Sequence, residues 1–169
     1  MIRRARYEDI CQLMDIYNEA IINSIATFDT EEKSFDERKR WFEEHLEDPY
    51  VIFVKEIDGV AVGYASLSRY RDRKAFDGSV EISIYLHKDY RGQGIGKELM
   101  EFVLDFAQKN KKINTVVSLI TGENISSCKL HEKFGFKYCG ELKKVGFKFN
   151  KWLDLKVYQI IYERDEMNG

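Results

Sequence analysis

The chain has 169 residues, 44% of them apolar and 14% aromatic, which is the length of one ordinary domain and enough apolar material for a core. Its 27 basic and 29 acidic side chains nearly balance, so a nucleic-acid partner is not favoured. The apolar runs are far shorter than the roughly 20 residues that span a bilayer. No apolar stretch follows the charged N-terminus either, so we expect a cytoplasmic protein without a signal peptide or membrane contact.

The cysteines and histidines indicate neither disulfides nor a metal. Cys11, Cys128 and Cys139 are widely spaced and odd in number, which is typical of reduced thiols. No pair of cysteines and histidines has the spacing of metal ligands, so we predict no metal site. No repeat, low-complexity tract or proline-rich linker divides the chain, and we expect residues 1–169 to form a single domain.

The N-terminal part of the chain predicts one short strand and two helices. Residues 2–6 alternate weakly, as a strand does, and Asp9 is a candidate start for the first helix. Ser34 or Asp36 can cap a second helix, which Pro49 is expected to stop. The apolar face of the first helix recurs every three or four residues, at Ile10, Leu13, Met14, Tyr17, Ala20 and Ile21.

Three strands are expected next. The β-rich runs 50–57 and 60–67 flank Asp58 and Gly59, a dipeptide typical of a two-residue hairpin because both turn positions need positive φ. A basic, polar loop then leads into a third strand over residues 79–87.

The C-terminal half alternates helices and strands. A strand over 114–120 is followed by a helix over 124–133 that Gly135 ends, and two further strands lie around Gly146. The resulting order of strands and helices predicts one α/β or α+β domain with a mixed sheet. The longest predicted helix follows a run of glycines and has its apolar positions at Ile95, Leu99, Phe102, Val103 and Phe106.

The glycine run lies between a strand and that helix. Glycines there let backbone N–H groups approach an anion, and a helix N-terminus favours phosphate. The run lacks the G-x-G-x-x-G spacing of dinucleotide-binding folds. Three residues separate Gly92 from Gly96, whereas a P-loop has four between its glycines. The run therefore does not favour NAD or ATP as the ligand. A plain turn is the alternative, although turns rarely need three alternating glycines before a strong helix. The run reads Arg91, Gly92, Gln93, Gly94, Ile95, Gly96 and Lys97.

Several motifs together resemble the GNAT superfamily of N-acetyltransferases. Arg91, Gly94 and Gly96 are similar to its pyrophosphate motif, Q/R-x-x-G-x-G/A, and Asn124 with residues 127–136 is similar to its second signature. Residues 80–86 and 145–154 more narrowly resemble the phosphinothricin and methionine-sulfoximine N-acetyltransferase group. The resemblance covers essentially the whole chain. It implies a central twisted mixed sheet of about seven strands flanked by about four helices.

The resemblance implies acetyl-CoA as the acetyl donor, which passes its acetyl group directly to an amine. A strand segment is expected to pair its backbone with the pantetheine arm, and one of its amides would polarise the thioester carbonyl as an oxyanion-hole donor. Lys97 is alternatively a solvated residue, and Ser127 alternatively caps a helix. The implied cofactor-binding residues are Ile84, Tyr85, Leu86, Arg91, Gly92, Gln93, Gly94, Ile95, Gly96, Lys97, Asn124 and Ser127.

Glu81 is the candidate general base. It interrupts an apolar strand, where a merely structural carboxylate is poorly accommodated, and the matching Glu is the proposed base of the phosphinothricin group. A solvent-facing carboxylate is the alternative. His131 stands where many members have a Tyr that protonates the leaving thiolate, so it is a candidate general acid, although a structural role is favoured.

The acceptor is expected to be a small amino-acid-like molecule. Arg71 and Arg73 precede the catalytic strand, and arginines in this loop of the related group hold the acceptor carboxylate; a solvated basic loop is equally compatible with their positions. Phe149 and Leu153 replace histidines of the phosphinothricin enzymes, which favours the methionine-sulfoximine and methionine-sulfone type. Aromatic residues that could line the acceptor pocket, although they are more often core, are Trp41, Phe28 and Tyr85.

We therefore predict an acetyl-CoA-dependent N-acetyltransferase for phosphinothricin or methionine sulfoximine or sulfone. Two alternatives stay open. One is a CoA-binding or CoA-sensing module without turnover, which Glu81 within its strand argues against. The other is an acetyltransferase for protein or peptide α-amines. The resemblance also suggests a homodimer.

Overall fold

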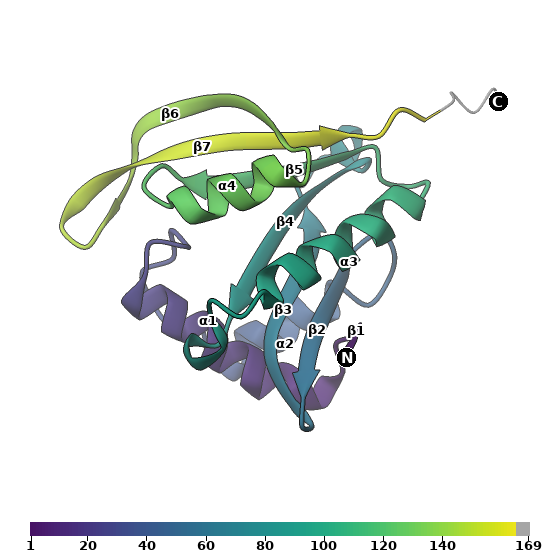
Figure 1. Cartoon of the computed structure of the whole chain (residues 1–169), viewed down its shortest axis with the longest axis vertical. Helices are drawn as coiled ribbons and strands as arrows, with labels where there is room; N and C mark the ends of the chain where they lie inside the picture. The colour runs from purple at the N-terminus through teal and green to yellow at the C-terminus, as the bar shows by residue number, and fades with distance from the viewer. Residues whose placement is uncertain (165–169) are drawn as a thin grey trace.

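A computed structural model describes residues 1–164, which form one twisted seven-stranded sheet with helices on both faces (Figure 1). The strands lie in the order β1-β2-β3-β4-β5-β7-β6, and every neighbouring pair is antiparallel except β4 and β5, which are parallel. The predicted mixed sheet of about seven strands is confirmed. The strands are β1 Ile2–Arg4, β2 Val51–Ile57, β3 Val60–Arg69, β4 Ser79–Leu86, β5 Thr115–Thr121, β6 Lys137–Lys148 and β7 Lys151–Ile161.

Four α-helices accompany the sheet within the described residues, as predicted. Residues of α1 and α2 pack with Tyr64 in one buried cluster, and α3 packs with Val80 and Val116 in a second, larger cluster to which α4 also contributes. The helices are α1 Ile10–Asn23, α2 Phe35–Glu43, α3 Ile95–Lys109 and α4 Ile125–Lys133, with single 3₁₀ turns at Tyr7–Asp9, Lys74–Phe76 and Lys88–Tyr90. No helix among residues 1–164 combines the length and apolar character needed to cross a membrane.

Local sequence signals explain several boundaries. The Ser34 hydroxyl accepts a hydrogen bond from the Glu37 N–H, and the Glu37 carboxylate accepts one from the Ser34 N–H, so a complete capping box begins α2. Asp58 and Gly59 have φ values of 50° and 79°, which is the turn that the Asp-Gly dipeptide predicts between β2 and β3.

The last hairpin turns at a different place from the one expected. The chain reverses at Phe149 and Asn150, which have φ values of 51° and 58°, whereas Gly146 lies inside β6 opposite Leu153. A Cβ atom built at Gly146 would lie 2.2 Å from the Phe28 ring. Gly146 is therefore required by close packing against the α1–α2 connection and not by a turn.

The two parallel strands separate soon after they pair. Only residues Ser79 to Glu81 of β4 pair with β5, opposite Thr115 to Val117, while β5 continues to pair with β7 along its whole length. The β5-facing edge of β4 beyond Glu81 therefore has no strand partner in the described part of the chain. Backbone N–H and C=O groups along that edge remain available for a ligand, because buried polar backbone groups need a partner.

Candidate active site

The glycine run forms a loop at the start of α3. Gly92 and Gly94 have φ values of 75° and 83°, and Gly94 occupies the N-cap without a side-chain hydrogen bond. A Cβ atom at either glycine would meet nothing within 4 Å, so open space lies beside the loop. The first helical bond joins the Glu98 N–H to the Gly94 carbonyl, which leaves the N–H groups of residues 95–97 without a helical acceptor. Such an end attracts phosphate.

The polar side chains of the loop hold its shape. Arg91 donates to the carboxylate of Glu19 on α1 and, over 3.3 Å, to the carbonyl oxygen of Leu86 at the end of β4. Gln93 Nε2 donates to the Asp89 carbonyl oxygen over 3.2 Å. Lys97 lies exposed on the first turn of α3. Arg91 thus ties the loop to both the helix and the strand beside it.

The free edge of β4 ends next to this loop. Ile84 and Leu86 direct their side chains into the core under α3, while Tyr85 lies on the opposite face. The Tyr85 ring packs edge-on against Tyr17, with ring centroids 5.1 Å apart, and burial raises its pKa well above the ordinary value. Both side-chain faces of this segment are therefore occupied by packing, and its backbone edge is what remains for a ligand.

Glu81 stands where β4 and β5 part. Its register partners are Ser68 on β3 and Val117 on β5, and strand alternation places it on the same face as Ser83. The carboxylate makes no hydrogen bond or ion pair with any residue in the range 1–164. Burial raises the pKa of Glu81, and the charge of Arg71 partly opposes that shift. A half-buried, unpaired carboxylate of this kind is suited to accepting a proton.

The two arginines of the β3–β4 loop differ in their effect on Glu81. Both Arg71 and Arg73 are exposed, and Arg73 precedes the 3₁₀ turn Lys74–Phe76. Only Arg71 acts on the pKa of Glu81. The structure therefore brings Arg71, but not Arg73, into the electrostatic surroundings of the candidate base.

His131 is buried, and both of its ring nitrogens are engaged. Nδ1 lies 2.7 Å from the carbonyl oxygen of Ser127, and Nε2 lies 2.8 Å from the Ser118 hydroxyl. Because a carbonyl oxygen can only accept, Nδ1 carries the proton and Nε2 accepts from Ser118. Burial lowers the pKa of His131. This geometry joins α4 to β5 and leaves His131 as a neutral packing residue.

Asn124 and Ser127 lie at the start of α4, the helix that follows β5. The Asn124 side-chain oxygen accepts from the Ser127 N–H over 3.3 Å, so Asn124 is the N-cap of α4. The Ser127 hydroxyl lies 3.4 Å from Nδ1 of His131. Both side chains are thus used in helix capping and in the contacts of His131.

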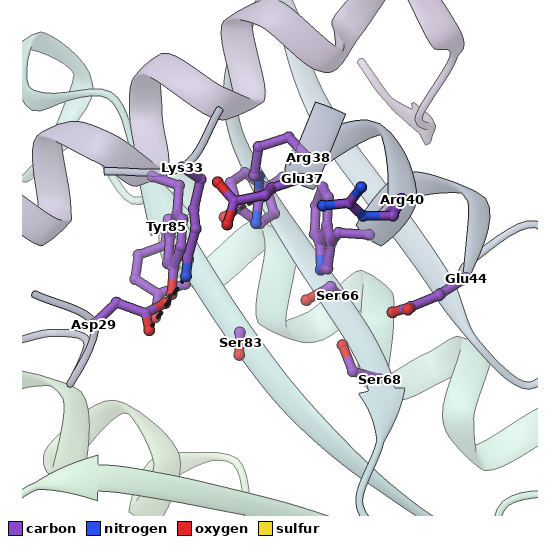
Figure 2. Close-up of a pocket in the computed structure, with 13 residues that line it drawn as sticks. Asp29, Lys33, Glu37, Arg38, Arg40, Glu44, Ser66, Ser68, Ser83 and Tyr85 are labelled. Atoms are coloured by element: carbon purple, nitrogen blue, oxygen red, sulfur yellow. Dashed lines mark hydrogen bonds and ion pairs between the residues drawn. The ribbon is translucent and has the colours of Figure 1, made fainter. Parts of the chain in front are cut away.

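A cavity of about 380 Å³ lies between α2, the α1–α2 connection and the neighbouring face of β3 and β4 (Figure 2). Trp41 and Tyr85 line it, whereas Phe28 packs against Gly146. Glu81 is not among the lining residues; it lies two residues before Ser83 on the same face of β4. The lining residues are Tyr17, Asp29, Lys33, Glu37, Arg38, Arg40, Trp41, Glu44, Tyr64, Ser66, Ser68, Ser83 and Tyr85.

Sequence reasoning missed the polar lining of this cavity. Ser66 and Ser68 alternate with apolar residues along β3, and Ser83 does so along β4, a period of two that places them on the face of Glu81. Arg38 follows Phe35 by three residues and precedes Phe42 by four, so the helical period places a charge on the apolar face of α2. Both signals are readable once the two faces of the sheet are known.

No group of three or more His, Cys, Asp or Glu residues within residues 1–164 could hold a metal ion. The candidate site therefore consists of a glycine loop, a free strand edge, a half-buried carboxylate and a polar cavity.

Comparisons with known proteins agree with this arrangement. Residues 2–157 match the acetyltransferase (GNAT) domain family. The chain is 36% identical to the L-amino acid N-acyltransferase MnaT of Escherichia coli strain K12, and the match covers 98% of this chain and 96% of that protein. It is 33% identical to an L-methionine sulfoximine/L-methionine sulfone acetyltransferase of Salmonella typhimurium, with 94% and 92% covered.

A similar solved structure is a GNAT superfamily phosphinothricin acetyltransferase from Sinorhizobium meliloti in complex with acetyl-CoA. The two chains superpose with a TM-score of 0.91 and are 30% identical, and the match covers 100% of this chain and 91% of the other.

Proposed function

The chain belongs to the GNAT acetyltransferase family, and we propose that it transfers the acetyl group of acetyl-CoA to the amine of a small amino-acid-like acceptor. The relatives named above are N-acyltransferases or acetyltransferases of amino acids and of methionine sulfoximine, methionine sulfone and phosphinothricin. The observation that carries the proposal is the unpaired Glu81 carboxylate at the point where β4 and β5 separate.

The donor site is proposed to lie along the free edge of β4 and the glycine loop. The N–H groups at the start of α3 suit a diphosphate, and the open space beside Gly92 and Gly94 leaves room for it. The backbone from Ile84 to Leu86 is available to pair with an amide-containing arm, and one of its N–H groups can stabilise a developing oxyanion. Acetyl-CoA supplies a thioester carbonyl as the electrophile. We propose that Asn124 and Ser127 support this site indirectly, by fixing the start of α4.

Glu81 is proposed to take the proton from the acceptor. An ammonium group with a pKa near 8 to 10, on the order of reference values, must lose a proton before its nitrogen can attack. The raised pKa of Glu81 brings its basicity closer to neutral pH, which improves proton transfer. His131 is proposed to have a structural role, because both of its ring nitrogens are engaged.

Arg71 is proposed to hold the carboxylate of the acceptor. An α-carboxylate is bonded to the carbon that carries the amine, so its partner must lie near the base, as Arg71 does. Arg73, two residues further along the exposed loop, is a weaker candidate for the same role.

A Glu81→Gln variant tests the assignment of the base. We expect its acetylation of methionine sulfone, measured as thiol release from acetyl-CoA, to fall by about 10²-fold or more, because the amide cannot accept the proton. Binding of acetyl-CoA should persist. The matched control is Glu101→Gln on the exposed side of α3, which should retain wild-type turnover. An undiminished rate in Glu81→Gln would contradict the assignment.

The same assay separates the two alternative functions. A CoA-sensing module would bind CoA and release no thiol with methionine sulfone, methionine sulfoximine, phosphinothricin or any other amine tested. A peptide α-amine acetyltransferase would acetylate peptides and show no inhibition by the free amino-acid analogues.

We further propose a homodimer that forms through the β6–β7 hairpin, which extends from the body of the fold (Figure 1). Phe147 and Trp152 pair across the hairpin with ring centroids 5.2 Å apart, yet they are 53% and 59% exposed. Leu142, Val145 and Phe149 are exposed on the same hairpin. Exposed apolar surface of this kind is typical of an interface, and a second copy of the chain is the occupant that we propose.

The remaining proposals concern extent and location. We propose that residues 1–169 form one domain, because the two buried clusters share a single sheet. A cytoplasmic location is supported by Cys11, Cys128 and Cys139, which are all free thiols.

A further inference from the structure

Arg38 occupies an unusual position for a charged residue. It lies on the apolar face of α2 at 5% exposure, and its guanidinium carbon lies 3.6 Å from the ring centroid of Trp41 and 4.6 Å from that of Tyr17. These aromatic contacts fix the plane of the guanidinium beside the cavity that Arg38 lines (Figure 2).

Most hydrogen-bond donors of Arg38 have no partner in the described part of the chain. Nη2 donates to the Tyr64 hydroxyl over 3.1 Å, but the buried Nε has no acceptor, and no carboxylate among residues 1–164 forms an ion pair with the guanidinium. A guanidinium has five N–H donors, and a buried charge without a partner is costly. The arrangement is therefore that of a binding site in which a ligand supplies the hydrogen-bond acceptors for Arg38.

Two of the three acidic residues that line the cavity already have partners within the described chain, and the third, Glu44, is exposed at the C-terminal end of α2. Asp29 accepts from the Tyr17 hydroxyl and forms an ion pair with Lys33, and Glu37 caps the start of α2. On the opposite wall, Ser66 and Ser83 are register partners with small side chains, so hydroxyl groups face the helix across the cavity. The cavity thus offers hydrogen-bond donors to an oxygen-rich group.

The position of Arg38 selects which end of the acceptor it would bind. Tyr64, to which Arg38 donates, pairs with Tyr85, and Tyr85 follows Glu81 by four residues on the same face of β4, so Arg38 contacts this face further along the strand than Glu81. Ser83 lies between Glu81 and Tyr85 on the same face. The α-carboxylate must stay near Glu81 and Arg71, so a group that reaches Arg38 belongs to the far end of the acceptor side chain.

We infer that Arg38 binds the oxygen-bearing end of the acceptor side chain: the sulfone, sulfoximine or phosphinate oxygens. These groups share S–O or P–O acceptors that suit a guanidinium. The inference rests on the proposed function and assigns the specificity of the same site. An acceptor of equal length without these oxygens would leave the donors of Arg38 unpaired, and the enzyme would discriminate against it.

The test compares methionine sulfone with norleucine, which keeps the amine and α-carboxylate but lacks the distal oxygens. For the wild type we expect a kcat/KM ratio of sulfone to norleucine of about 10 to 10², as one to two charge-assisted hydrogen bonds provide. Arg38→Met should reduce the ratio to about 1 while its rate with norleucine changes little. Arg38→Lys should be intermediate. Lys39→Met, on the same helix but outside the lining of the cavity, should keep the wild-type ratio.

Phosphinothricin distinguishes an anionic group from a neutral one. Because its phosphinate is charged, Arg38→Met should lose more activity with phosphinothricin than with the sulfone. A loss confined to phosphinothricin would overturn the sulfone part of the inference.

The remaining outcomes of the comparison between methionine sulfone and norleucine would overturn the inference or the proposed function. A wild-type ratio near 1, or equal losses of sulfone and norleucine activity in Arg38→Met, would overturn the inference and leave Arg38 a structural residue. If Arg38→Met does not fold, the wild-type and Arg38→Lys ratios decide, and an unchanged ratio in Arg38→Lys overturns the inference. A wild-type enzyme that acetylates no amino-acid analogue at all would instead contradict the proposed function.

Discussion

Three buried or half-buried polar side chains of this protein differ in how far their hydrogen bonds are satisfied. His131 is fully paired and neutral, Glu81 is half-buried and unpaired, and Arg38 is buried with aromatic rings around it and one hydrogen bond. Burial of a polar group costs free energy unless its hydrogen bonds are met. The paired residue is therefore expected to serve stability, and the two unpaired residues are expected to serve the substrate.

The buried histidines predict a loss of stability in mild acid. Burial lowers the pKa values of His131 and His45 from the ordinary 6.5. Below about pH 6.5 the unfolded chain binds protons that the folded protein does not, so the free energy of unfolding falls as the pH falls. We expect urea unfolding at pH 7, 6 and 5 to show this decline, and His131→Gln to be less stable at pH 7 but to decline less steeply.

Ile22→Gln is the control, because Ile22 is exposed on α1 and neither side chain titrates. It should keep the wild-type dependence of stability on pH. An equally steep decline in His131→Gln would show that the burial of His131 does not cause it.

At the scale of secondary-structure elements, the junction between β4 and α3 carries the proposed donor site. The period of α3 and the glycine run before it are local signals, and both the helix and the positive φ values follow from them. The separation of β4 from β5 is not local, because it depends on β5 pairing with β7 instead. The glycine loop was therefore readable from the local pattern, whereas the free strand edge beside it was expected only through the resemblance to a known family.

Gly94→Ala tests this junction. An alanine at a φ of 83° is strained by about 1–2 kcal/mol, and relief of that strain would turn the N–H groups at the start of α3 away from the diphosphate. We expect the KM for acetyl-CoA to rise by roughly 10-fold, as the loss of one charge-assisted hydrogen bond predicts.

Gly59→Ala is the matched control for backbone strain. Gly59 has a φ of 79° with nothing within 4 Å of its Cβ position, but it lies in the hairpin between β2 and β3. Its replacement should lower the melting temperature to a similar degree and leave the KM for acetyl-CoA unchanged. An unaltered KM in Gly94→Ala would contradict the proposed donor site.

At the scale of the whole molecule, the β6–β7 hairpin gathers several exposed large apolar side chains on one projecting element. If this hairpin joins two copies, the double variant Phe147→Ser, Trp152→Ser should sediment as a monomer at micromolar concentrations at which the wild type is a dimer. Leu46→Ser removes an apolar side chain that is 58% exposed elsewhere on the surface, and it should remain dimeric. A monomeric wild type at every concentration would refute the homodimer.

Local patterns were sufficient to predict most elements of this fold. The Asp58-Gly59 hairpin, the Ser34 cap, the glycine run and the apolar period of α3 all act over a few neighbouring residues, and their outcome does not depend on the rest of the chain. Glu81 was a candidate for the same reason, since a carboxylate within an apolar strand is visible in the sequence alone.

The contacts between distant segments required the folded chain. The hairpin turns at Phe149 and Asn150, while Gly146 packs against Phe28, which is more than a hundred residues away in the sequence. Arg38 is a binding candidate because α2 packs so that Arg38 contacts Tyr64 and lines a cavity with the serines of β3 and β4, which the sequence of α2 does not show. Side-chain periodicity states which face of an element is polar, but what that face meets depends on how the elements pack, and packing is a property of the whole sheet.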